Sequence, residues 1–183
     1  MANPTLSIAP PAPAAPDPTV TLVSSFRLRL ERQDGVWLDR SPVACPAQAA
    51  ERLYPLLPPE RLEVGGALFL DAAGAPIGYR VSSLPPCEAT GCELRDLLAT
   101  ALLSDARALI LGHRRDTRGL ATQRSDLDRI ADLVRLGHAI RLAVLDYLVL
   151  AADGRFSSLQ DEFPELWLNR PRHLLAWRSG LDA

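Results

Sequence analysis

The chain has 183 residues, of which 48% are hydrophobic and 23% charged, the proportions of an ordinary globular protein. This length predicts one domain with tails, large enough to bury a core. The net charge of −2, from 20 basic and 22 acidic residues, excludes a strongly basic protein that binds nucleic acid through its overall charge.

The cysteines and the N-terminus indicate the compartment. Three cysteines, an odd number, do not make a disulfide framework. Cys87 and Cys92 have CxxxxC spacing with no second pair, so we expect free thiols instead of a zinc site. The N-terminus lacks the basic and apolar regions of a secretory signal, and no apolar run is long enough to span a membrane. We therefore expect a cytoplasmic protein with no membrane partner.

The first part of the chain changes character at Val20. Residues 1–19 are rich in alanine and proline and predict a disordered tail. From Val20 to Leu30 the pattern ends in alternation, which predicts a half-buried strand; its apolar members are Phe26, Leu28 and Leu30, and its charged members are Arg27 and Arg29. A turn at 33–35 and a short partner strand at 36–38 are expected next.

The middle of the chain predicts a helix, a hairpin and a second helix. The expected elements are a short helix at 46–57, a strand at 63–71, a turn at 72–76, a returning strand at 77–81 and a helical stripe at 94–102. Pro58 and Pro59 end the first helix, and Glu93 stands near the positive end of the second.

The stretch from Ala108 to Gly137 carries the side chains that could take part in a reaction or bind a metal. Ala108–Leu111 is a continuous apolar run, typical of a strand buried on both faces, and it leads to His113 at the strand end. A polar loop rich in arginine follows. A helix is then expected from about Leu127, with Ser125 as its N-cap and Gly137 as its end.

The last part predicts a strand, a turn, a short strand and a tail. The expected ranges are 142–150, 152–155, 156–159 and 161–183. Trp167 and Trp177 lie in the tail, where we expect a partial helix or a docked extension. Strands with interspersed helices, without a nucleotide-binding glycine motif or an internal repeat, predict an α+β (α/β-like) fold with a mixed sheet flanked by helices. We assign residues 20–160 to this domain.

From about Ser41 to Leu159, these strings resemble the RadC-like JAB domain, a branch of the JAB/MPN (JAMM) metallopeptidase superfamily. The similar strings are Glu63–Asp71, Ala108–His113, Leu145–Val149 and Asp153–Leu159. The resemblance implies a cytidine-deaminase-like architecture and a zinc hydrolase site. In that site Glu63 is the catalytic residue, and His113 and Asp126 are metal ligands.

The sequence departs from the family's metal motif, which is a distal glutamate, then H-x-H-P-S-G, then S-x-x-D. Arg115 stands at the second histidine; Asp116, Thr117 and Arg118 replace Pro-Ser-Gly, and Gln123 replaces the serine. An arginine has no lone pair to give a metal. Its positive charge would also repel a divalent cation nearby. At about 4 Å and an effective dielectric constant of about 20, this repulsion is roughly 4 kcal/mol for each pair of unit charges.

We therefore expect Arg115 to replace the metal, pairing with Glu63 and Asp126. A third zinc ligand from His138, Cys87 or Cys92 is conceivable, but the spacing does not point to one. Each site residue also has a structural alternative. Glu63 can be an exposed strand-edge residue, His113 can bond to backbone, and Asp126 can be a first-turn aspartate stabilised by the helix dipole.

The function we predict is a degenerate RadC-like JAB domain that binds a protein partner, performs no catalysis and needs no cofactor. The family's name and neighbourhood imply a DNA-maintenance or mobile-element context. One alternative is a zinc-dependent metallopeptidase or isopeptidase with an atypical metal site. Another is a nucleic-acid-associated protein that uses the arginine-rich loop 113–124, although such loops are usually only solvated; its arginines are Arg114, Arg115, Arg118 and Arg124.

Overall fold

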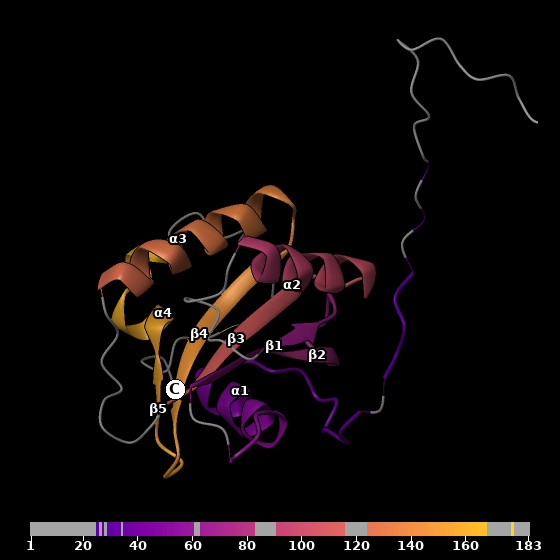
Figure 1. Ribbon diagram of the computed structural model, residues 1–183. Coiled ribbons are helices and arrows are strands. Elements are labelled where there is room, and N and C mark those ends of the chain that lie inside the picture. The colour runs from indigo at the N-terminus through magenta and orange to yellow at the C-terminus, as the bar shows by residue number, and fades with distance from the viewer. Residues whose placement is uncertain are drawn as a thin grey trace, which may run out of the picture.

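The computed structural model describes residues 25, 27, 29–33, 35–60, 63–82, 91–115, 124–167 and 177, without the side chains of 91, 92 and 124–126. The elements are α1 (Pro46–Leu53), η1 (Tyr54–Leu56), β1 (Val64–Leu70), β2 (Pro76–Ser82), α2 (Gly91–Leu103), β3 (Ala108–Arg115), α3 (Arg124–Ala139), β4 (Ala143–Ala151), β5 (Phe156–Ser158), α4 (Leu159–Glu162) and η2 (Pro164–Trp167) (Figure 1). Within the described parts, no helix is long and apolar enough to cross a membrane.

One five-stranded sheet organises the domain, with the strand order β2-β1-β3-β4-β5. The β3–β4 pair is parallel and the three other pairs are antiparallel. Parallel neighbours need a crossover connection, and α3 supplies it. The mixed sheet with flanking helices confirms the predicted α+β class.

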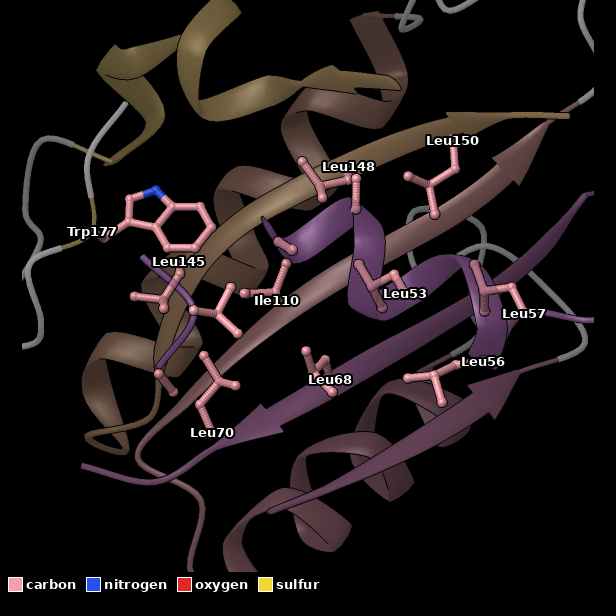
Figure 2. Packing of buried hydrophobic residues seen from close by; sticks show 14 of the residues in the cluster. Leu53, Leu56, Leu57, Leu68, Leu70, Ile110, Leu145, Leu148, Leu150 and Trp177 are labelled. Carbon is pink, nitrogen blue, oxygen red and sulfur yellow. The ribbon is translucent and has the colours of Figure 1, made fainter. Parts of the chain in front are cut away.

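Helices cover both faces of the sheet. On one face, Leu53 of α1, Leu56 of η1 and the next residue, Leu57, lie over side chains of the central strands (Figure 2). These side chains include Leu68 and Ile110. On the other face lie α2 and α3, which pack against the alternate residues of the same strands (Figure 1). Every residue of β1 and β4 is buried. A strand covered on both sides has no polar face, which explains the continuous apolar runs in the sequence.

Two tryptophans of the tail pack against opposite faces of the sheet. The indole nitrogen of Trp167 donates to the carbonyl of Val144 at 2.9 Å, on the face covered by α2 and α3. Trp177 lies beside Leu145 on the α1 face, and its indole nitrogen donates to the side-chain oxygen of Gln160 (Figure 2). The docked extension expected for the tail is therefore seen at these two tryptophans.

The strands expected before residue 40 are not formed by the residues that the structure describes there. Arg29 and Leu30 carry no strand, nor does Val36–Leu38, and no turn is assigned at Gln33 or Gly35. The other residues of the expected 20–30 strand are partly outside the described set, as is the 1–19 tail. Alternation gives a strand its two faces but not a neighbour, and an unpaired strand is unstable in water.

Three local predictions also need correction. β3 continues through His113 to Arg115, so the histidine is not at a strand end. α3 already includes Ser125, which is therefore not its N-cap. Gly137 does not end the helix but lies within it. The position requires a glycine because a Cβ there would be 2.5 Å from the carbonyl oxygen of Leu142. The left-handed residue that follows the helix is Arg141, with φ +58°.

Candidate functional site

Glu63 and His113 meet because β1 and β3 are paired. Gly65 is opposite His113 and Val64 is opposite Arg114, so the residue before β1 reaches the end of β3. The Nε2 atom of His113 lies 2.8 Å from Oε2 of Glu63. A hydrogen bond from the imidazole to a carboxylate oxygen requires the tautomer that carries its proton on Nε2. The pairing of two strands thus joins residues that are 50 positions apart in sequence.

The contact spans the boundary between core and solvent. The His113 side chain is 1% exposed, whereas that of Glu63 is 47% exposed. Glu63 also has φ +59°, a left-handed backbone that costs a residue with a Cβ roughly 1–2 kcal/mol. Strain of this kind persists where surrounding contacts hold a residue in place, and it is concentrated at functional sites.

Arg115 shares the Glu63 carboxylate. Arg115 and His113 are two residues apart in β3, so their side chains leave the same face of the sheet. The Nε atom of Arg115 lies 3.8 Å from Oε2 of Glu63, and its side chain is 17% exposed. One carboxylate therefore contacts an imidazole and a guanidinium. The side chain of Asp126, the second carboxylate expected to pair with Arg115, lies outside the described part of the structure.

Glu63, His113 and Arg115 do not by themselves supply the ligands of a zinc site. A structural or catalytic zinc takes at least three protein ligands with free lone pairs. Among the described residues, no three histidine, cysteine, aspartate or glutamate side chains are grouped to hold a metal ion. The Nε2 atom of His113 is engaged with Glu63, and the second basic group beside that carboxylate is an arginine, which cannot ligate.

The sheet register removes one of the possible third ligands. His138 lies shortly before Ala143, and Ala143 is opposite Ala108 at the start of β3. His113 is instead opposite Val149, near the ends of both strands. His138 is therefore at the other end of the sheet from His113. Cys87 and the side chain of Cys92 lie outside the described residues.

Two of the four arginines expected in one basic loop, Arg114 and Arg115, point to opposite faces of the sheet. Arg114 and Arg115 both lie in β3, where neighbouring side chains point to opposite faces. Arg114 is 9% exposed on the α1 face, and its Nη1 atom donates to the carbonyl of Leu57 at 3.2 Å. Arg118 is outside the described residues, as is the side chain of Arg124. In the described part, these two arginines do not make a joint solvent-exposed patch.

Asp146 is a buried carboxylate to which sequence reasoning gave no role. Its side chain accepts hydrogen bonds from the Ser158 hydroxyl at 2.6 Å, the Tyr147 amide at 2.7 Å and the Gln160 amide at 3.0 Å. Burial is the main cause that raises the pKa of Asp146 to about 7, against these hydrogen bonds, which lower it. A single acidic residue inside an apolar strand was the available signal.

A family model described as the RadC-like JAB domain matches residues 43–163, well over half of the chain. The chain belongs to this family. The matched range includes β1 to β5, together with Glu63, His113 and Arg115. The resemblance expected from the sequence is thereby confirmed.

Curated relatives of this RadC-like JAB domain include three UPF0758 proteins. The protein from Methanococcoides burtonii is 29% identical over 63% of this chain and 52% of its own length. The protein from Thermosynechococcus vestitus is 28% identical over 69% of this chain and 50% of its own length. That from Methanosarcina acetivorans is 23% identical over 77% and 61%. The chain thus spans about half the length of the first curated relatives it matches.

Proposed function

We propose that this chain is a RadC-like JAB domain that binds a protein partner and does not hydrolyse peptide bonds. The observation that carries the proposal is the position of the Glu63 carboxylate, 2.8 Å from His113 Nε2 and 3.8 Å from Arg115 Nε. A general base for metal-assisted hydrolysis needs a metal-bound water to act on. Here the glutamate is held by two basic side chains instead.

Arg115 opposes metal binding through its positive charge, in addition to lacking a lone pair for the metal. A guanidinium stays protonated at all physiological pH values, so the Arg115 side chain keeps a positive charge beside Glu63. A divalent cation at the same place would meet this charge without the ligand needed to offset it. At about 4 Å the repulsion is roughly 4 kcal/mol for each pair of unit charges at an effective dielectric constant of about 20.

The biological setting we infer is a DNA-maintenance or mobile-element context, which rests on the family resemblance alone. In that setting the domain would serve as a scaffold or binding module. A zinc-dependent metallopeptidase or isopeptidase is the competing function, since the Glu63–His113 pair is retained. The two functions differ in one measurable property, which is the binding of zinc.

The test is the variant Arg115→His, which restores a second imidazole two residues from His113. We expect this variant to gain zinc binding, measured as metal stoichiometry and as a rise in unfolding temperature when zinc is added. A ligand present at about 100 times its Kd stabilises the folded state by roughly 2.7 kcal/mol. The wild-type chain should show neither effect.

The matched control is Arg107→His, the same change at an exposed arginine that pairs with Asp105 instead of Glu63. This control should gain no zinc. If Arg115→His also gained none, Arg115 would not be the group that excludes the metal. If the wild-type chain bound one zinc ion through His113, the non-catalytic function would be wrong.

A further inference from the structure

Among the residues before α1, several apolar side chains are exposed to solvent, while the residues next to them contact the domain. Trp37 is fully exposed, and Val36 and Leu30 are 46% and 43% exposed. The next residue, Leu38, packs against the core of the α1 face. Asp39 then pairs with Arg52 of α1 at 2.5 Å. We call residues 29–37 the arm, and these contacts of Leu38 and Asp39 fix the point at which the arm joins the domain.

The arm makes no strand with its own domain. Its described residues carry no strand assignment, and all of their side chains are exposed. Figure 1 shows the indigo chain leading away from α1 and the sheet. The sequence has a strand pattern that ends at the start of the arm, since Leu30 is the last apolar member of an alternation with Phe26 and Leu28, two residues outside the described part. A segment with this pattern needs an edge to pair with.

β2 offers such an edge. It is the outermost strand of the sheet, and among the described residues only β1 pairs with it (Figure 1). Six of its seven residues are partly or fully exposed, in contrast to the buried β1. Tyr79 and Val81 are only partly covered on the α1 face. An edge with exposed backbone groups is a template for pairing with another chain.

We propose that the arm of one copy of this chain adds as a strand to the outer edge of β2 in a second copy, and that the reciprocal contact closes a two-fold dimer. Each copy carries one arm that pairs with no strand among the described residues, and one outer edge of β2 that is likewise unpaired there. A two-fold axis satisfies both at once and leaves no open contact to extend a filament. Backbone hydrogen bonds would provide the affinity, as in other strand-addition complexes.

The two faces of the arm match the two faces at β2. With Leu30 turned to the α1 face, it would cover the exposed parts of Tyr79 and Val81. Arg29 would then lie on the opposite face, where α2 covers β2. That face carries the carboxylate of Asp96, 67% exposed and 3.8 Å from Arg80. The charge on the arm is thus opposite in sign to the acidic group it would meet. Trp37 supplies the residue type most enriched in binding hot spots.

The test measures the mass of the full chain in solution over a range of concentrations by sedimentation velocity. We expect a dimer that dissociates on dilution. The double variant Leu30→Arg/Trp37→Ala lacks the apolar contacts of the arm and should be monomeric. The variant Ile77→Lys places a charge on the exposed edge of β2 and should also be monomeric. Circular dichroism establishes that both variants are folded.

Two controls separate this contact from general stickiness. Leu102→Arg replaces an equally exposed leucine on α2, and Phe156→Lys changes an exposed residue on the other edge strand, β5. Both should dimerise like the wild-type chain. Mixing the arm variant with the Ile77→Lys variant restores one intact arm and one intact edge. A mixed dimer should therefore form, held by one contact instead of two.

A wild-type chain that stays monomeric at every concentration would overturn the proposal. So would a dimer that survives the arm variant, or a Phe156→Lys variant that is monomeric. Failure of the two monomeric variants to pair on mixing would show that they had not lost complementary halves of one contact. None of these outcomes depends on zinc, so they are independent of the function proposed above.

Discussion

Nε2 of His113 and Oε2 of Glu63 lie 2.8 Å apart, with the histidine buried and the glutamate at the surface. The pair joins β3, two residues before its end, to the residue that precedes β1. In a metallopeptidase these two residue types would face each other through a metal and its water. Here they touch directly, with Arg115 as the second neighbour of the carboxylate.

The strained backbone of Glu63 predicts a difference between two truncations. Both Glu63→Ala and Glu63→Gly remove the carboxylate, but only glycine adopts φ +59° without a Cβ penalty. We expect the glycine variant to be more stable than the alanine variant by about 1 kcal/mol, measured by urea denaturation. Equal stabilities would mean that the left-handed conformation at this position carries no cost.

Asp146 predicts a loss of stability as the pH rises. The unfolded residue releases its proton near its ordinary pKa of 3.8, whereas folded Asp146 has a pKa of about 7. Between these values folding takes up a proton, so this group lowers the free energy of unfolding by about 1.4 kcal/mol for each pH unit. Its contribution is full below pH 3.8 and lost once the pH passes about 7.

Asp146→Asn should remove this dependence, because the amide stays neutral and still offers an acceptor to the Tyr147 and Gln160 amides. At about pH 8 the variant should exceed the wild-type chain in stability by up to roughly 4 kcal/mol, and near pH 4 the two should be similar. Asp132→Asn, at an exposed aspartate, is the control and should change little. Parallel pH profiles for wild type and Asp146→Asn would contradict the assignment.

Replacing Gly137 by alanine should destabilise the protein, although alanine favours a helix more than glycine does. Alanine stabilises an ordinary helix position by about 1 kcal/mol relative to glycine. At Gly137, however, the new Cβ would lie 2.5 Å from the backbone carbonyl of Leu142, which cannot rotate away. We expect a net loss of about 1–3 kcal/mol in chemical denaturation. Gly78→Ala should cause no such loss, since its Cβ would meet only Phe69, at 3.6 Å.

The same substitution should have unequal costs at two tryptophans, Trp177 in the tail and Trp37 in the arm. Trp177 is 8% exposed among the leucines of the α1 face, so Trp177→Ala should cost about 3–5 kcal/mol. Trp37 is fully exposed, and Trp37→Ala at low concentration should change stability by less than about 0.5 kcal/mol. Urea denaturation followed by circular dichroism compares the two. Similar costs would show that Trp177 does not anchor the tail.

The sequence predicts the elements whose signals are local. Continuous apolar runs indicate β1, β3 and β4, and helical spacing indicates α1 to α3. Where the outcome depends on a neighbour, prediction fails. Alternation before Leu30 could not reveal that the residues described there, 25, 27, 29 and 30, form no strand. Gly137 suggested a helix end because glycine is common there. The sequence does not show that the carbonyl of Leu142 comes too close for a side chain at this position. The helix start also differs, since Ser125 lies inside α3.

The site was accessible from the sequence only through resemblance. Glu63 and His113 are 50 residues apart, and no spacing rule places them together. The register of β1 against β3 does so. The contact between Glu63 and Arg115 follows from the same register, because alternate residues of β3 share a face. Asp146 was overlooked because its three hydrogen-bond donors come from its neighbour and from elements further along the chain.

The most direct test of the central claim is the zinc stoichiometry of the purified wild-type chain after incubation with zinc and removal of the excess. We predict no stoichiometric zinc, because His113 is engaged by Glu63 and Arg115 keeps a positive charge beside them. One zinc ion per chain in the wild type, lost in His113→Ala, would contradict the account.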